Sequence, residues 1–371
     1  MKSFPKNKHA LWLGRAQFLL SIVTAIGFVL VFYLEASQSS AWGEFNARVI
    51  GREFESSKQA IEKIQTEDEL DAWISARERH VDEVLSQQGL AIKSDQRAQV
   101  HWAHRKTKSS LVKTPISLVY IHGFSAGPLE FEPTLSVLAR KLGANLFIAR
   151  LTAHGIRDAK GVSSGEEFAT VRARDWALDV EEAVAIGRRI GERPVFIGLS
   201  TGATLLLEHF ARHAKPELKG QDREALVLLS PNYEPQAFGT FLLEGFGASF
   251  FAHHILGDYT GFETTNDLHR DRWTWRYRVE GLIPMMQLVS RVRSLDLGTI
   301  RSPVLTVYTP YDDVVRVDKI LDRSKAFSGK SKLLSWEGTR HHQMASAAFD
   351  PAKVEELSDL ILGWIRIVVA E

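Results

Sequence analysis

The sequence predicts an α/β fold, in which a mostly parallel β-sheet is covered by helices on both faces. From Gly89 onward, short apolar runs rich in β-branched residues alternate with longer runs of helical periodicity, which is typical of such sheets. Hydrophobic residues make up 44% of the 371 residues, enough for a large core. The alternation contains no internal repeat and no low-complexity run.

The alternation predicts a definite order of elements. Strands are expected at 98–103, 116–121, 145–150, 194–199, 225–230, 304–308 and 332–336. Helices are expected at 131–142, 175–190, 201–214, 317–327 and 352–369. Asp175 is expected to cap the second of these helices. Residues 91–371 are therefore predicted to form one domain.

One segment of this domain, from 232 to about 300, breaks the alternation. It lies between two core strands, is far longer than an ordinary connection and is rich in aromatic residues. Such an insertion over the C-terminal edge of a sheet is typical of a lid or cap. Aromatic side chains beyond the cap's own core would line an apolar pocket suited to an acyl or aromatic group.

The N-terminal segment has a different character. Residues 1–15 form a basic tail, and residues 16–34 hold no charged residue. As a helix, 16–34 would span about 28 Å, close to the hydrocarbon thickness of a bilayer. The basic excess before it predicts a single-pass membrane protein with a cytoplasmic N-terminus and an extracytoplasmic domain, periplasmic if bacterial. A cleaved signal peptide and a buried helix are the alternatives.

Residues 35–90 are predicted to be a helical linker or stalk. Apolar positions recur at helical spacing between residues 44 and 88, with a break near Thr66-Glu67-Asp68. One or two amphipathic helices are expected there, and a partner-binding helix is the alternative reading.

Two motifs carry chemistry. Ser200 lies in Gly198-Leu199-Ser200-Thr201-Gly202, between an expected strand and an expected helix. This pattern is typical of a nucleophile elbow, whose glycines allow a sharp turn that exposes the serine hydroxyl at a helix N-terminus. Strand 116–121 runs into His122-Gly123-Phe124-Ser125, a turn in which a backbone N–H can face a substrate oxygen.

With Arg150-Leu151-Thr152-Ala153-His154-Gly155, these motifs resemble the α/β-hydrolase superfamily, and within it the monoacylglycerol lipase and bacterial carboxylesterase branch. The resemblance covers about residues 95–370 and implies the α/β-hydrolase fold, a serine nucleophile and no cofactor. The chain departs from the family pattern at Ala153, where Gly is common, and at Thr201, where Met or Gln is common. Neither departure removes a catalytic side chain.

A serine nucleophile needs a base, and the base needs a carboxylate to orient it. In this superfamily the chain order is Ser, then Asp or Glu, then His. The acid candidate is Asp312, which follows the expected strand 304–308. Asp313 is the second choice, and Glu234 a weaker third.

The base candidate is one of two adjacent histidines after the last expected strand. His342 precedes Gln343-Met344-Ala345, and the family often places two larger residues and a small one after its histidine. His341 remains the alternative. The oxyanion hole is expected from the backbone N–H groups of Phe124 and Thr201.

Composition narrows the function further. A net charge of +1 gives no basis for nucleic-acid binding, and the absence of cysteine excludes a thiol nucleophile, disulfides and Cys-ligated zinc. His209 and His213 share a helix face, but no third ligand is evident, so no metal is expected.

The sequence therefore predicts a membrane-anchored serine hydrolase that cleaves small-molecule esters with a hydrophobic acyl group, such as a monoglyceride or lysophospholipid. A thioesterase, peptidase or acyltransferase on the same triad is the alternative among enzymes. A non-catalytic binding or scaffold protein is the alternative from another class. The oligomeric state is not predicted.

Overall fold

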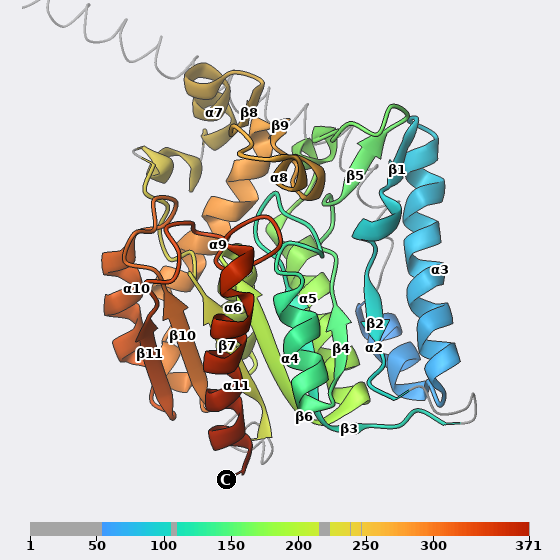
Figure 1. The fold of residues 1–371 in the computed structure, drawn as a ribbon. Helices are drawn as coiled ribbons and strands as arrows, with labels where there is room; N and C mark the ends of the chain where they lie inside the picture. The colour runs from blue at the N-terminus through green and yellow to red at the C-terminus, as the bar shows by residue number, and fades with distance from the viewer. Residues whose placement is uncertain (1–53, 105–109, 215–222, 238, 246, 371) are drawn as a thin grey trace, which may run out of the picture.

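The computed structural model describes residues 54–104, 110–214, 223–237, 239–245 and 247–370, and it has the predicted α/β architecture (Figure 1). The central sheet has seven strands in the order β11-β10-β7-β6-β3-β4-β2. All neighbouring strands are parallel except β2, which pairs antiparallel with β4 at the edge. The strands are β2 (Gln99–His101), β3 (Thr114–Ile121), β4 (Asn145–Ile148), β6 (Gly191–Leu199), β7 (Ala225–Leu229), β10 (Val304–Tyr308) and β11 (Ser331–Ser335).

Helices cover both faces of this sheet. In Figure 1, α4 (Thr134–Leu142) and α11 (Val354–Ala370) lie in front of it. The other face is covered by α5 (Ala173–Ile190) and α6 (Thr201–Arg212). Because side chains alternate along a strand, β3 supplies both cores: Leu118 and Tyr120 pack with α4 and α11, while Val119 and Ile121 pack with α5 and α6.

Local signals explain how these helices begin and end. Helix α4 ends where Gly143 adopts a left-handed conformation with φ 59°, which a glycine adopts without strain. Helix α5 begins at Ala173, two residues before the predicted start. The carboxylate of Asp175 accepts the N–H of Arg172 at 2.8 Å. Asp175 is thus the third helical residue, rather than the cap itself.

The segment between β7 and β10 is called here the cap segment (residues 232–300), and its longest helix packs against α6 as part of the main core. It contains η4 (Thr240–Leu243), α7 (Ala248–Leu256), β8 (Tyr259–Gly261), α8 (Asp267–Arg272), β9 (Arg276–Arg278), η5 (Val279–Gly281), α9 (Leu282–Ser294) and η6 (Leu297–Thr299). Strands β8 and β9 form an antiparallel pair. The pair lies with α7 and α8 above the sheet in Figure 1.

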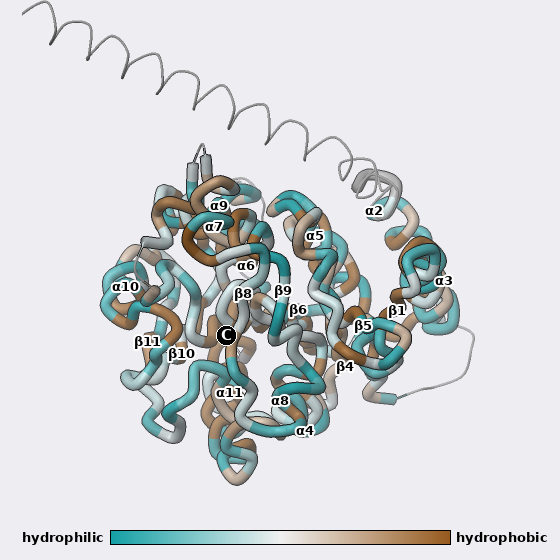
Figure 2. The backbone as a smooth tube through the Cα atoms, turned by 90° about the horizontal axis from the view of Figure 1, so that it is seen from above, coloured by the Kyte–Doolittle hydropathy of each residue, from teal (hydrophilic) through white to brown (hydrophobic). Residues whose placement is uncertain are grey.

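Two N-terminal helices, α2 (Phe54–Lys63) and α3 (Glu67–Ser86), flank the domain at the side of β2 and α5 (Figures 1 and 2). The break falls where predicted, because the Thr66 hydroxyl accepts the N–H of Glu69 at 3.1 Å and caps α3. Leu70 and Ile74 of α3 join the main core.

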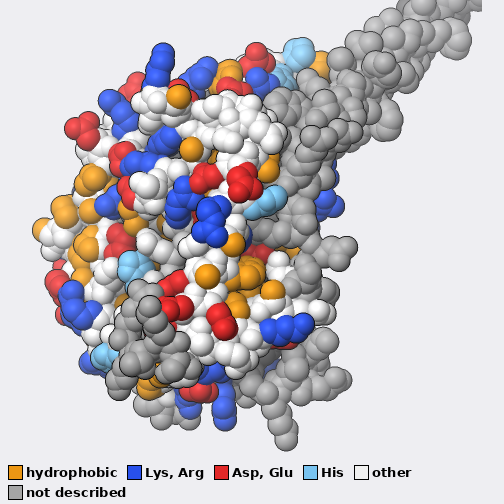
Figure 3. Space-filling view, turned by 90° about the vertical axis from the view of Figure 1, so that its right-hand side faces the viewer, with side chains coloured by type: hydrophobic (Ala, Val, Ile, Leu, Met, Phe, Trp, Pro, Cys, Tyr) orange, Lys and Arg blue, Asp and Glu red, His pale blue; other side chains and the backbone are white. Residues whose placement is uncertain are grey.

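Smaller elements complete the described chain. Strand β1 (Leu90–Ile92) pairs antiparallel with β5 (Ile156–Asp158), and neither was expected from the sequence. The remaining elements are η1 (Ser94–Gln96), η2 (Glu166–Ala169), α10 (Val317–Arg323), η7 (Ser324–Ala326) and η8 (Pro351–Lys353). On the side of the molecule that carries α3, positive and negative side chains are mingled (Figure 3).

The structure contradicts the prediction of a single-pass membrane protein with an extracytoplasmic catalytic domain. In the part of the chain that the structure describes, no helix is both long and apolar enough to cross a bilayer. The longest of these helices, α3, carries charged side chains along its whole length, which a membrane interior disfavours. The predicted tail (1–15) and anchor (16–34) lie outside the described residues.

Candidate active site

Ser200 is the single residue between the end of β6 and the start of α6. Its φ of 55° lies in a region that residues other than glycine rarely adopt. The backbone around it is held by hydrogen bonds, because its N–H donates to Leu229 O at 2.9 Å and its carbonyl accepts from Thr204 N at 3.2 Å. The sharp turn predicted from the motif is therefore present.

This turn requires the two glycines of the motif, because neither position has room for a side chain. A Cβ added at Gly198 would lie 2.6 Å from the backbone nitrogen of Ala203. A Cβ added at Gly202 would lie 2.1 Å from the carbonyl oxygen of Ile121. Both contacts are with backbone, which cannot easily shift, so α6 approaches β3 and β6 only with glycine at these positions.

His342 and Asp312 form a hydrogen-bonded pair beside this turn. Asp312 follows β10 and His342 follows the adjacent strand β11, so the parallel pairing brings their loops together. His342 Nδ1 lies 2.7 Å from Asp312 Oδ2, and both side chains are buried. The other imidazole nitrogen, Nε2, is buried without a hydrogen-bond partner among the described residues.

Burial and charge set the titration of this pair. Burial by itself would lower the pKa of His342, but the Asp312 carboxylate outweighs it and holds that pKa above its usual value. Burial would raise the pKa of Asp312, but the His342 charge and the N–H groups of Val314 and Val315 lower it. Asp312 is therefore an ionised acceptor that fixes the imidazole.

The alternative acids and base take no part in this hydrogen-bonded pair, although Asp313 and His341 lie at the same cavity as Ser200. Asp313 and His341 are exposed, and the His341 ring packs against Phe349. Glu234 pairs with Arg316 at 2.8 Å on the surface. The structure thus brings Asp312 and His342 together, and it does not bring these alternatives into that pair.

The two expected oxyanion-hole residues both line the cavity that contains Ser200. Thr201 is the first residue of α6, whose leading N–H groups have no partner within the helix. Phe124 follows β3, the neighbour of β6 in the sheet. A Cβ placed on the adjacent Gly123 would lie 3.4 Å from Ser200 Cβ, so this loop runs beside the serine.

Glu130 is a buried acid at this site that sequence reasoning missed. Its Oε2 accepts the N–H of Gly123 at 2.7 Å and the hydroxyl of Tyr120 at 2.9 Å. Burial raises its pKa to about 7, although these hydrogen bonds and the charge of His342 oppose the rise. The only sequence signal for Glu130 was the presence of an acidic residue just after a Gly-rich turn.

One cavity of about 830 Å³ connects these groups. Its floor holds Ser200, Thr201, Phe124, Glu130 and His342. Its walls come largely from the cap segment, with the apolar residues Leu242, Leu243, Phe251, Ala252, Leu256, Phe262, Trp273, Tyr277, Leu282, Met285 and Met286. The cap therefore closes over the carboxyl end of β6 and gives the cavity an apolar wall.

A second cluster of polar groups lies on the helices behind the sheet. Glu181 of α5 joins His209 of α6 and His213, which caps α6, and one ligand atom of each lies within 4.8 Å of the others. The sequence showed the two histidines but not the acid, because α5 and α6 meet only in the folded chain. This set of two imidazoles and one carboxylate is separate from the cavity residues.

Comparison with known proteins agrees with this architecture. A family model described as alpha/beta hydrolase family matches residues 118–357. A structure reported with LipS and LipT, two metagenome-derived lipolytic enzymes, superposes with a TM-score of 0.53 and 19% identity, over 69% of this chain and 95% of that one. A monoacylglycerol lipase from Paleococcus ferrophilus gives 0.50 and 14% identity, over 68% and 93%.

At these identities the likeness to solved structures shows the fold alone, and no curated protein matches the chain in sequence. The family model, however, spans well over half of the chain and includes the elbow, the acid loop and the histidine loop. The chain therefore belongs to the alpha/beta hydrolase family.

Proposed function

We propose that this protein hydrolyses carboxylic esters with Ser200 as the nucleophile, His342 as the base and Asp312 as the residue that orients the base. The observation that carries the proposal is the cavity that Ser200 and His342 share, in which Asp312 holds one imidazole nitrogen and leaves the other unpaired. An unpaired, buried nitrogen is what a general base needs.

In the first half of the reaction, Ser200 Oγ attacks the ester carbonyl and His342 Nε2 takes the hydroxyl proton. Asp312 stabilises the imidazolium that forms. The N–H groups of Phe124 and Thr201 meet the negative charge that develops on the carbonyl oxygen. The tetrahedral intermediate collapses when His342 gives its proton to the departing alcohol, which leaves an acyl group on Ser200.

In the second half, water replaces the alcohol. His342 removes a proton from the water as it attacks the acyl carbonyl, and the same two N–H groups stabilise the new intermediate. Its collapse returns the proton to Ser200 and releases the carboxylic acid. No step in this scheme needs a cofactor.

The apolar wall of the cavity favours substrates with a hydrophobic acyl group, and monoglycerides and lysophospholipids are our proposed examples. A cavity of about 830 Å³ has the size of a small-molecule site. Leu243, Ala252 and Met286 are buried apolar side chains on this wall. They match an alkyl chain better than a charged or sugar group.

The test is labelling with a fluorophosphonate, followed by hydrolysis of p-nitrophenyl esters of increasing chain length. Wild-type protein is expected to react, whereas Ser200→Ala should not react and should lose roughly 10⁴–10⁶-fold in kcat. Asp312→Asn is expected to lose about 10⁴-fold, because the imidazole loses its tautomer control. Asp313→Asn serves as the matched control and should stay near wild type.

A folded wild-type protein that neither reacts with the probe nor hydrolyses any ester would refute the proposed esterase activity. Equal losses for Asp312→Asn and Asp313→Asn would refute the assigned acid. Short soluble esters cleaved far faster than long ones would refute the hydrophobic acyl preference.

A further inference from the structure

Helix α3 lies outside the family match at 118–357, yet it contributes a buried charge to the domain. Glu78 is on the inner face of α3, between the apolar positions Ile74 and Val81, and its side chain is 2% exposed. A charge in such a position requires a partner. Its location therefore points to a specific connection between α3 and the hydrolase core.

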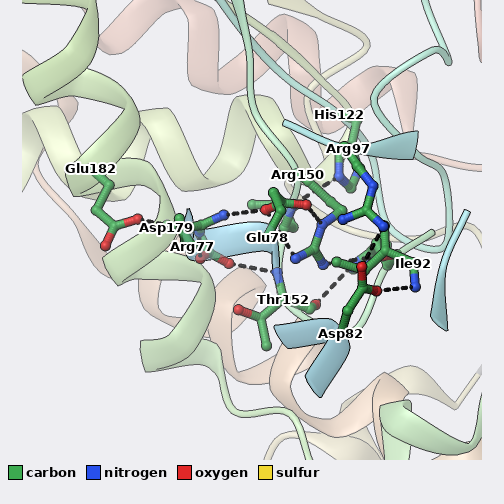
Figure 4. A network of polar contacts seen from close by, with 12 residues as sticks. Arg77, Glu78, Asp82, Ile92, Arg97, His122, Arg150, Thr152, Asp179 and Glu182 are labelled. Carbon is green, nitrogen blue, oxygen red and sulfur yellow. Dashed lines mark hydrogen bonds and ion pairs between the residues drawn. The ribbon is translucent and has the colours of Figure 1, made fainter. Parts of the chain in front are cut away.

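The partner is Arg150, which follows β4. Glu78 Oε2 accepts from Arg150 Nε at 2.7 Å and Oε1 from Arg150 Nη2 at 3.1 Å, which is a bidentate pair. Arg77 bonds the same carboxylate and also reaches Asp179 and Glu182 of α5. Figure 4 shows Glu78 with the two guanidinium groups directed toward it.

Arg150 also contacts the loop that ends at His154. Its Nη1 donates to the carbonyl oxygen of His154 at 3.3 Å. The imidazole of His154 in turn accepts the N–H of Ser125 at Nε2, 3.1 Å away. Because Nε2 accepts, the ring proton is on Nδ1, which lies 2.9 Å from Thr152 O and donates to it.

His122 makes an equivalent pair of hydrogen bonds on the other side of Phe124. Its Nε2 accepts the N–H of Leu151 at 3.0 Å, so its Nδ1 carries the proton and donates to Gly123 O at 2.9 Å. Burial lowers the pKa of His122 to about 4 and that of His154 well below its usual value, so both rings are neutral. Gly123 and Ser125 flank Phe124.

We infer that Glu78 and Arg150 are positioning residues that hold the Phe124 N–H in the geometry needed to stabilise the oxyanion. The connection runs from α3 through Arg150 to the loop 150–154, and from the two imidazoles to the residues on either side of Phe124. The inference rests on the proposed ester hydrolysis. It assigns to helix α3 a role in the rate of the chemical step.

The expected kinetic signature follows from where the effect acts. The oxyanion exists only in the transition state and the intermediates, so a displaced donor slows turnover without weakening substrate binding. A displacement of about 1 Å costs on the order of 10²-fold in rate. Loss of the Glu78 charge should therefore lower kcat and leave KM nearly unchanged.

The test compares Glu78→Gln with Asp82→Asn in the full chain, using p-nitrophenyl butyrate and monitoring folding by circular dichroism. Asp82 is the matched control because it lies one turn further along α3 and also ties the helix to the domain, through Ile92 N at 2.8 Å. Glu78→Gln should lose on the order of 10–10²-fold in kcat with KM within about twofold. Asp82→Asn should keep wild-type kinetics.

Glu78→Gln leaves Arg150 buried without its partner, which is costly, so a second variant is needed in case Glu78→Gln does not fold. The double variant Glu78→Met with Arg150→Met replaces the pair by apolar side chains of similar size, which proteins often tolerate. It should fold and show the same kcat loss. A folded Glu78→Gln or double variant with wild-type kcat would overturn the inference, as would a loss confined to KM.

The wild-type protein and Ser200→Ala, assayed in parallel, separate this inference from the function on which it rests. If wild type hydrolyses the ester and Ser200→Ala does not, the proposed function stands, and the Glu78 result decides the positioning role alone. If wild type does not turn over, the proposed function itself fails.

Discussion

At the scale of single residues, the site depends on how burial and charge divide the roles of neighbouring polar groups. Asp312 and Asp313 are adjacent, but only Asp312 is buried and bonded to an imidazole. His341 and His342 differ in the same way. Adjacent residues of one loop therefore differ in burial and in hydrogen-bond partners, even though Asp313, His341 and His342 all line the cavity.

The Glu130 carboxyl gives a prediction at this scale, because its charge acts on His342. Asp312, Asp313 and Glu130 all raise the pKa of His342 against the effect of burial. The imidazole acts as a base only when neutral, so activity falls at low pH as it protonates. Because the pKa of Glu130 is about 7, its carboxyl is only partly ionised on the acid limb. Glu130→Gln removes this partial negative charge, lowers the pKa of His342 and should move the acid limb of kcat/KM slightly to lower pH.

The measurement is the pH profile of kcat/KM for wild type, Glu130→Gln and Glu132→Gln. Glutamine retains an oxygen that can accept from Gly123 N and from the Tyr120 hydroxyl, so the turn should persist. Glu132 is the matched control, because its carboxylate accepts the Ser136 hydroxyl at 2.9 Å and the residue does not line the cavity. Identical limbs for wild type and Glu130→Gln would rule out this electrostatic coupling.

At the scale of elements, the turn from β6 into α6 decides where Ser200 lies. Its geometry comes from two backbones in close contact rather than from side-chain packing. The first turn of α6 approaches the end of β3 across Gly202, and a hydrogen bond to Leu229 of β7 helps to hold Ser200 at its unusual φ. The position of Ser200 is thus a property of three strands and one helix together.

Replacing Gly202 by Ala should therefore disrupt this turn. The new Cβ would lie 2.1 Å from Ile121 O, so we expect a loss of about 1–3 kcal/mol in the free energy of unfolding, with loss of esterase activity. Gly363→Ala in α11 is the matched control, because nothing lies within 4 Å of its added Cβ. There alanine should stabilise by up to about 1 kcal/mol through helix propensity.

Thermal unfolding and ester hydrolysis of both variants provide the check. Gly202→Ala with wild-type stability and rate would show that the close approach at the elbow does not matter.

At the scale of the whole molecule, the cavity is formed between two layers, with polar groups from the sheet edge below and apolar groups from the cap segment above. Substrate preference should thus depend on the cap, whereas the chemical step depends on the sheet loops. Helix α9 contributes Met285 and Met286 to this wall.

Met285→Trp should shift the preference toward shorter acyl chains, since the larger ring occupies space on the cavity wall. We expect kcat/KM for a C10 p-nitrophenyl ester to fall by about 10–200-fold relative to the C4 ester. Leu268→Trp, on the exposed side of α8 and outside this cavity, is the control. An unchanged C10/C4 ratio in Met285→Trp would contradict the assignment of this wall.

What the sequence determined by itself is local. The alternation of strands and helices, the elbow around Ser200, the break before α3 and the long aromatic insertion are all patterns of contiguous residues. Each reflects a short-range cause, namely strand or helix periodicity, a capping hydroxyl or a glycine that allows a tight turn. These patterns were sufficient for the fold class and for a serine between strand and helix.

What only the tertiary structure decided is which distant groups meet. It paired His342 with Asp312, 30 residues away, and Glu78 with Arg150, 72 residues away. It also brought Glu130 to the loop beside Ser200 and the cap side chains to the cavity. The physical reason is that burial and hydrogen-bond partners depend on how helices and sheet pack, and no short stretch of sequence contains that information.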